Sequence, residues 1–555
     1  MFKPKSIAYR VHTSLAYPNA FKNTINEYEK AVMPAPSQCR LNKHGAPQAM
    51  LSSTLRFCSL PVENAVVQPG DLCLSNPLLI FKHRTPETVL KPQLITLFML
   101  NIHISPSLLG LLTLIGGLIS FSALAQEPST ERPNIILIVA ESHRAEALGA
   151  ANHPFLQTPH LDELARAGTH FENAYVSSAI CVVSRASILT GQQAARHGIN
   201  DFADRFSAAD FQKTFPLRLK AAGYQLAWLG WFGIGSPPST DAFDLWQPDI
   251  PWIQDDLHHT DQITERASNW LANQDGQQPF FMQINYSAAH EIDPTENQPA
   301  QFLVQQRHQQ LFADINIANP LSADPAVWQS FPDFFRTDDN IARARWHGFF
   351  DSPELLQQST KDYYRLIAGL DEAVGKLRQS LSELGLAENT IIIYTSDHGF
   401  SLGEHGLMGK WYPFEQNIRV PLLIHHPSDP NFAHSVRKDI ALNIDLAPTL
   451  LDLAGLPIPS DMQGQSLRNL PINETDRRTH FYYQHATLGS PLLPQTEAIV
   501  TPQLKYIYFP EHGYEMLYDL SKDPAELHNV AEEPDYQKQL DQLRAQLTND
   551  RRAAR

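Results

Sequence analysis

Cys181 and Arg185 are the first residues in this chain whose types and spacing suggest chemistry. The segment that opens at Cys181 has a helix-like composition. A helix N-terminus offers partial positive charge and free N–H groups to an anion or an anionic nucleophile. A lone cysteine is more often buried and inert, so its neighbours decide its role. With Arg185 one helical turn away, we place Cys181 nearest the nucleophile position of a reaction on an anionic substrate.

Other polar residues stand directly after apolar runs of the sequence. Glu141 follows one run, His290 another, and Asp397 with His398 a third, with Lys410 shortly beyond. Carboxylates from two strand ends can hold a hard divalent cation, and Arg, Lys and His side chains can neutralise an oxyanion. These residues predict metal-assisted phosphoryl or sulfuryl transfer.

The elements that must position these residues are apolar strands that alternate with helices. Continuous apolar runs are typical of strands buried on both faces of a parallel sheet, where ligands bind beyond the carboxyl ends. We therefore predict an α/β fold with a large mixed, mostly parallel sheet sandwiched by helices. The predicted strands are 134–140, 225–230, 279–285 and 390–395, and the clearest predicted helices are 158–168 and 361–386.

The last part of the chain has a different rhythm. Short aromatic-rich runs bounded by turn residues predict a small antiparallel sheet, followed by a polar helix at 535–551. We expect a catalytic domain at 132–470 and a smaller C-terminal α+β subdomain at 471–555. The segment 294–351, rich in Phe, Trp, Gln and Asp, reads as an insertion near the pocket mouth that shapes substrate choice.

Composition excludes several classes of protein. The 555 residues have a formal net charge of −16, which argues against nucleic acid or an anionic membrane as the main partner. Apolar residues make up 43% of the chain, enough for a large core, so disorder is excluded for most of it.

The N-terminal part differs from the rest. Residues 1–98 read as a doubtful extension ahead of a start at Met99, and 99–126 as a signal peptide. The apolar run 108–125 ends in Ala123-Leu-Ala125, small residues that fit signal-peptidase cleavage. An uncleaved membrane anchor is the alternative. We expect an exported protein, periplasmic or secreted, that contacts a membrane only if the anchor reading holds.

In order along the chain, these motifs resemble the sulfatases of the alkaline phosphatase superfamily. The resemblance runs from about Arg132 to Glu533, which covers most of the chain. The matching elements include Arg132-Pro-Asn-Ile-Ile-Leu-Ile-Val-Ala140, Cys181-x-x-Ser-Arg185 with Leu189-Thr-Gly191, Ser396-Asp-His-Gly399, Gly409-Lys410 and Arg419-Val-Pro421. The resemblance implies an alkaline phosphatase-like fold and hydrolysis of an organic sulfate ester, with either an aryl or a carbohydrate alcohol.

The resemblance also implies a cofactor set and residue roles. In the family, a formylglycine-generating enzyme oxidises the cysteine of a Cys-x-Pro/Ala-x-Arg motif, and the hydrated aldehyde attacks sulfur beside one Ca²⁺ ion. Carried over, Cys181 is the nucleophile precursor, stabilised by Arg185. His290 contacts the sulfate or the leaving group, and Lys410 binds a sulfate oxygen. The implied metal ligands are Glu141, Cys181, Asp397 and His398. For Glu141, a purely structural hydrogen bond remains as open as ligation.

Three departures from the family pattern bear on activity. The usual Asp-Asp pair after the first strand is Glu141-Ser142, which removes one negative charge and should weaken binding of a hard cation. Val183 replaces the Pro or Ala that the maturation enzyme recognises. The usual Gly-Lys-x-His becomes Gly-Trp231-Phe-Gly233, which removes two oxyanion stabilisers.

Three other functions therefore stay open beside sulfate ester hydrolysis. The lost charges favour a catalytically impaired protein that binds sulfated glycans. The scaffold also suits a phosphoester or phosphonate ester hydrolase. An exported protein that uses only the fold would leave the joint presence of Cys181, Arg185, Asp397, His398 and Lys410 unexplained.

Overall fold

The structure, a computed structural model, describes residues 132–294, 299–470, 477–486 and 493–555. The predicted extension at 1–98 and the export segment at 99–126 lie outside these residues. Within the described ranges, no helix is both long enough and apolar enough to cross a membrane.

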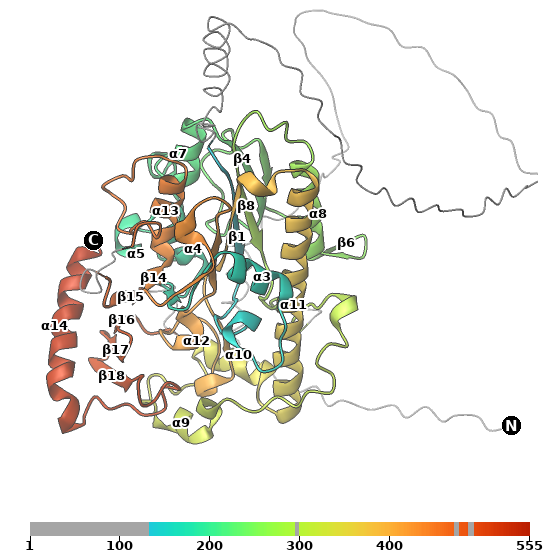
Figure 1. The fold of residues 1–555 in the computed structure, drawn as a ribbon. Coiled ribbons are helices and arrows are strands. Elements are labelled where there is room, and N and C mark those ends of the chain that lie inside the picture. The colour runs from blue at the N-terminus through green and yellow to red at the C-terminus, as the bar shows by residue number, and fades with distance from the viewer. Residues whose placement is uncertain (1–131, 295–298, 471–476, 487–492) are drawn as a thin grey trace, which may run out of the picture. The chain divides into compact units, whose positions relative to one another are not determined.

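A mixed eight-stranded sheet forms the centre of the molecule (Figure 1). Its strand order is β13-β2-β12-β9-β1-β8-β4-β5, and the run from β9 to β5 is parallel, while β12 is antiparallel to both of its neighbours. The strands are β1 Asn134–Ala140, β2 Thr169–Phe171, β4 Gln225–Gly230, β5 Leu245–Gln247, β8 Phe280–Tyr286, β9 Thr390–Ser396, β12 Leu422–His425 and β13 Ser435–Arg437.

The central strand β1 supplies side chains to both faces of the sheet. Ile135, Leu137 and Val139 enter one apolar core and the alternating residues enter the other, as the two-residue period of a strand requires. Because both faces are covered, β1 is apolar throughout. Helices α4, α7 and α13 pack on the first core, and α3, α8 and α11 on the second (Figure 1). Their bounds are α3 Pro159–Ala167, α4 Cys181–Thr190, α7 Phe215–Ala221, α8 His259–Leu271, α11 Pro353–Glu383 and α13 Leu446–Leu453.

The register of the central strands sets the level of the site. Ala140, the last residue of β1, pairs with Tyr286 of β8 and with Ser396 of β9. Three chain segments therefore leave the sheet at one edge, and the residues that follow them are brought together there.

Helix α11 begins at Pro353, before the predicted Lys361. Ser352 caps the helix by accepting a hydrogen bond from the Leu355 N–H, and Pro suits a first helical turn.

Short elements connect the sheet to its surroundings. They are β3 Ala174–Tyr175 with β14 Ala441–Leu442, β6 Ile253–Gln254 with β7 Leu257–His258, β10 Ser401–Leu402 with β11 Met408–Gly409, α5 Ala194–His197, α6 Ala208–Phe211, α9 Pro325–Ser330, α10 Ile341–Phe349 and α12 Glu415–Ile418.

A separate four-stranded antiparallel sheet lies near the C-terminus. It consists of β15 Phe481–His485, β16 Thr496–Val500, β17 Leu504–Phe509 and β18 Tyr514–Asp519. One face packs on the core that covers α4, and the other is covered by α14 Gln537–Ala553. The predicted fold class, a mostly parallel α/β sheet with a small C-terminal antiparallel sheet, is confirmed.

Candidate active site

The site begins where β1 and β9 end. The Asp397 N–H donates to the Ala140 carbonyl over 3.1 Å, and the Ser142 N–H donates to Asp397 Oδ1 over 3.2 Å. Ser142 has φ +65°, and its carbonyl accepts a hydrogen bond from Tyr363 Oη over 2.7 Å. These bonds hold Glu141, Ser142 and Asp397 side by side at the carboxyl edge of the sheet.

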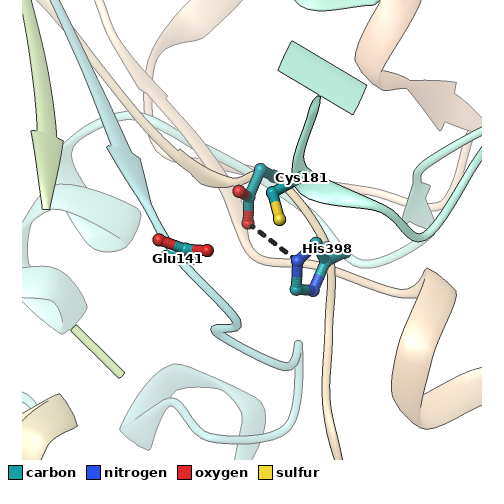
Figure 2. Close-up of side chains that lie close together, drawn as sticks. Glu141, Cys181 and His398 are labelled. Atoms are coloured by element: carbon teal, nitrogen blue, oxygen red, sulfur yellow. Dashed lines mark ion pairs between the residues drawn. The ribbon is translucent and has the colours of Figure 1, made fainter. Parts of the chain in front are cut away.

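Four of the predicted site residues form one buried cluster. Each of Glu141, Cys181, Asp397 and His398 offers a ligand atom, and these atoms all lie within 4.8 Å of one another. Figure 2 shows Glu141 at the end of its strand, facing Cys181 and His398. The structure thus brings together the four residues that the sequence resemblance assigned to a metal.

The free donor atoms of the cluster test whether a cation fits it. His398 Nδ1 donates to the Gly399 carbonyl over 2.7 Å, which leaves Nε2 with a lone pair and no hydrogen-bond partner among the described residues. Burial lowers the pKa of His398 to about 3, so the ring stays neutral. The hydroxyl oxygen of Ser142 is also buried without a partner there. Two carboxylates, an imidazole nitrogen and a hydroxyl form a donor set that fits a divalent cation.

Cys181 and Lys410 face each other on the other side of the cluster. Cys181 is the first residue of α4, and Lys410 Nζ lies 3.1 Å from its Sγ. Burial raises the pKa of the Cys181 thiol to about 12, although Lys410 opposes this. A thiol with so high a pKa is protonated at neutral pH and is a poor nucleophile. Cys181 therefore lies within the cluster, but its thiol is not ionised at neutral pH.

Arg185 joins the two carboxylates to the neighbouring strand. Its Nε donates to Asp397 Oδ2 over 3.0 Å, its Nη1 donates to Asn285 Oδ1 over 2.9 Å, and its Nη2 lies 3.9 Å from Glu141 Oε2. The guanidinium carbon stacks 5.1 Å from the centre of the Trp231 ring. Asn285, the next-to-last residue of β8, was not predicted, since a lone Asn in an apolar run carries no motif.

Gly233 stands where the family usually has a histidine. A Cβ at this position would lie 2.7 Å from Cδ of Arg185, and the residue has φ +80°, a conformation that favours glycine. The Arg185 side chain therefore lies where a side chain at 233 would begin. A side chain at position 233, such as the histidine usual in the family, would require Arg185 to move from its place over Trp231.

The surroundings shift the pKa values of Glu141 and Asp397 in opposite directions. Burial raises the pKa of Glu141, and Asp397 adds to the effect against the opposing charges of His290 and Lys410. Burial also acts to raise the pKa of Asp397, but the positive charges of Arg185 and Lys410 and the hydrogen bond from the Ser142 N–H act against it, and the pKa falls. Asp397 is therefore the firmer anion of the pair, and Glu141 gains most from a bound cation.

His290 lies at the outer side of the cluster. Its Nε2 is 3.9 Å from Glu141 Oε1, and its Nδ1 donates to the Glu291 carbonyl over 2.5 Å. All seven predicted site residues are thus brought to one edge of the sheet. His197 and His405 make other contacts: His197 bonds the Ser187 hydroxyl, and His405 stacks on Phe414.

Comparison with known families agrees with this geometry. A family model described as Sulfatase matches residues 133–456. A second, described as N-sulphoglucosamine sulphohydrolase, C-terminal, matches residues 403–553. The two matches together span nearly all of the described chain.

Individual relatives agree as well. An N-acetylglucosamine-6-O-sulfatase of Bacteroides thetaiotaomicron is 30% identical over 486 residues, covering 75% of this chain and 86% of the relative. An arylsulfatase of Clostridium perfringens is 26% identical over 473 residues, covering 76% and 94%. A solved structure in complex with its substrate D-glucosamine-2-N,6-O-disulfate superposes with a TM-score of 0.65 at 29% identity, covering 76% of this chain and 98% of the other.

A further solved structure shares the fold alone. The phosphonate monoester hydrolase of Agrobacterium radiobacter superposes with a TM-score of 0.60 at 21% identity, covering 76% of this chain and 96% of the other. Taken with the buried site at the sheet edge, the matching families and relatives show that the chain belongs to the sulfatases, enzymes of the alkaline phosphatase superfamily.

Proposed function

We propose that this chain hydrolyses an organic sulfate ester, with a formylglycine made from Cys181 as the nucleophile and Ca²⁺ as the cation. The observation that carries the proposal is the buried Cys181 thiol, 3.1 Å from Lys410 Nζ and within 4.8 Å of three potential metal ligands. Burial raises the pKa of this thiol to about 12, which makes the thiol itself a poor nucleophile, and conversion to an aldehyde would give position 181 a reactive group. At position 181 such an aldehyde, once hydrated, would supply a hydroxyl nucleophile, and a cation held by Glu141, Asp397 and His398 would polarise the sulfate.

The chain's own cations bind and orient the sulfate. Lys410, which is buried beside position 181, donates hydrogen bonds to a sulfate oxygen and stabilises the charge that develops there. Arg185 holds Asp397 in its ionised form and fixes it against β8 through Asn285. Glu141, Asp397 and His398 would hold the cation together with position 181, and the Ser142 hydroxyl, which has no partner in the described part of the chain, would complete the donor set.

His290 has the geometry of a proton donor to the leaving group. Its Nδ1–H is committed to the Glu291 carbonyl, so Nε2 is the nitrogen that faces the site. When the bond between sulfur and the alcohol oxygen breaks, the doubly protonated ring of His290 passes the proton on Nε2 to that oxygen and returns to the neutral form with its hydrogen on Nδ1. The side chain is 13% exposed, which lets the alcohol leave on this side.

The relatives support a carbohydrate sulfate as the substrate. The N-acetylglucosamine-6-O-sulfatase and the structure bound to D-glucosamine-2-N,6-O-disulfate are both named for sulfated amino sugars. Maturation would need a formylglycine-generating enzyme as partner, and the segment 99–126 favours export to the periplasm or beyond.

A phosphoester or phosphonate ester hydrolase is the second candidate. It is favoured by the phosphonate monoester hydrolase that shares the fold and by the 26% identical multifunctional alkaline phosphatase superfamily protein of Trinickia caryophylli. Ser142, which carries no charge where the family usually has a carboxylate, is one of the features of this chain that depart from the sulfatase pattern.

Two measurements on protein from its own host test the proposal. The first is the mass of the tryptic peptide 167–185, in which loss of sulfur and gain of an aldehyde oxygen shows formylglycine. The second compares turnover of matched sulfate, phosphate and phosphonate esters. An aldehyde with sulfate ester turnover supports the proposal. A free thiol with no turnover contradicts it, and faster phosphonate turnover selects the second candidate.

A further inference from the structure

Side-chain exposure rises steadily on one side of the active site. Lys410 is 4% exposed, His290 13%, Arg345 19% and Asp293 35%. Burial acts to raise the pKa of Asp293, but the charges of Arg345, His290 and Lys410 outweigh it and lower that pKa. Contacts link Asp293 to His290 as well, because Arg345 pairs with both Asp293 and Glu291, and Glu291 Oε2 lies 3.5 Å from His290 Nδ1. Asp293 and Arg345 are the more exposed of these four residues, and we call their side of the active site the exit.

Arg345 connects the exit to Glu291, the residue that follows His290 in the sequence. It comes from α10, within the segment that the sequence marked as an insertion near the pocket mouth. Its guanidinium forms an ion pair with Glu291, which is fully buried, and its Nη2 bonds Asp293 Oδ1 over 2.7 Å. The same group lies 5.7 Å from the centre of the Trp411 ring. Arg345 thus pairs with the buried Glu291 and with the more exposed Asp293 at the exit.

We propose that Asp293 and Arg345 form a subsite for the alcohol part of the substrate, which carries neighbouring hydroxyl groups as a sugar does. This subsite rests on the proposed function, because it extends the sulfate site outward. A paired carboxylate and guanidinium offer acceptors and donors side by side, and each sugar hydroxyl both donates and accepts. An aryl alcohol without further hydroxyls has nothing to pair with this subsite. Asp293 is therefore a specificity residue that discriminates a sugar sulfate from an aryl sulfate.

The test compares two esters on Asp293→Ala. Loss of a hydrogen bond to a charged group lowers kcat/KM by about tenfold or more. We expect that loss for glucosamine 6-O-sulfate and a change below about twofold for 4-nitrophenyl sulfate, which lacks the hydroxyls. Asp293→Asn, of the same shape, serves if the alanine variant folds poorly. Equal losses on both esters, or no loss on either, overturn the subsite.

A matched control and a binding readout keep the outcomes separate. Asp333→Ala breaks another ion pair of the same insertion, 2.6 Å from Arg336 and highly exposed, and should alter neither ester. Calorimetric titration with glucosamine 6-O-sulfate covers the case in which the protein hydrolyses nothing. Weaker binding to Asp293→Ala then supports the subsite while hydrolysis fails, and unchanged or absent binding overturns it.

Discussion

Tyr483 donates a hydrogen bond from its hydroxyl to the carbonyl of Trp411 over 2.5 Å. The same hydroxyl accepts from the Ala179 N–H over 3.4 Å, and the Trp411 N–H donates to the Ala179 carbonyl over 3.1 Å. One side chain of the C-terminal sheet thus ties the segment before Cys181 to the residue after Lys410. Trp411 has φ +86°, an outlier for a bulky residue, and such strain persists only where the surroundings enforce it.

Tyr483→Phe should slow the chemical step while substrate binding changes little. The variant keeps the ring but removes both hydrogen bonds of the Tyr483 hydroxyl, while the backbone bond from Trp411 to Ala179 stays. We expect kcat to fall about tenfold or more and KM to stay within about twofold, since positioning acts mainly on the transition state. Steady-state kinetics on a sulfate ester measure both constants, and hydrogen exchange of peptides around Ala179 and Trp411 should accelerate.

Tyr482 supplies the matched control on the same strand. Its hydroxyl donates to Glu497 Oε1 over 2.6 Å, on the face of β15 that packs toward α14. Tyr482→Phe should lose a similar free energy of unfolding, about 1 kcal/mol, with kcat unchanged. An equal fall of kcat in both variants would show that Tyr483 acts through stability alone.

Ser142→Asp should tighten binding of a divalent cation. The Ser142 hydroxyl is buried beside Glu141 and Asp397, with no partner among the described residues. A carboxylate in its place adds one negative charge and one hard ligand, so we expect Ca²⁺ affinity to rise about tenfold or more. Aspartate tolerates the φ of +65° found here. Calorimetric titration of chelator-treated protein gives the affinity.

Ser142→Asn is the control for shape without charge. It should bind Ca²⁺ about as weakly as the parent chain, because an amide oxygen adds no charge. If Ser142→Asp also left the affinity unchanged, Ser142 would lie outside the coordination sphere and the donor set proposed here would be wrong.

The strands and the location of the site were predictable from the sequence, because they depend on patterns among residues that are close together in the chain. Strands β1 and β4 match their predicted ranges, since continuous apolar runs bounded by polar residues identify buried strands directly. The site residues gather because parallel strands end at one edge. The ties between Tyr483 and Trp411, and between Arg345 and Glu291, join residues distant in sequence. No periodicity or spacing signals such contacts.

Val183→Ala should raise the fraction of protein in which residue 181 becomes formylglycine. The change creates the Cys-x-Ala-x-Arg pattern that the family's maturation enzyme recognises. Val183 is buried in α4, so truncation costs about 1–2 kcal/mol of stability. Peptide mass spectrometry of 167–185, after co-expression with a formylglycine-generating enzyme, gives the converted fraction.

Val182→Ala is the control for Val183→Ala, because Val182 is equally buried but lies at a variable motif position. It should lose comparable stability without a gain in conversion. Equal conversion of the parent chain and Val183→Ala would instead show that Val183 does not limit recognition.

Acid should destabilise the fold through buried histidines such as His485. Burial lowers the pKa of His485 from 6.5 to about 4. Between pH 6.5 and about 4 the unfolded chain binds more protons at this residue than the folded one, so the free energy of unfolding falls as the pH falls. The stabilisation is complete above pH 6.5, and its loss reaches roughly 3 kcal/mol once the pH is below about 4. Urea unfolding across this range measures the slope.

His485→Gln removes the titrating group and should flatten that slope, because glutamine stays neutral in both states. His528→Gln is the comparison, since His528 is largely exposed and its replacement should leave the slope unchanged. A slope unaffected by His485→Gln would mean that His485 becomes protonated without unfolding. Protonation without unfolding would require a local opening of β15, the strand that also carries Tyr483. Acid would then weaken the hydrogen bonds of the Tyr483 hydroxyl, one of which ends on Trp411, next to Lys410 in the sequence, before it unfolds the protein.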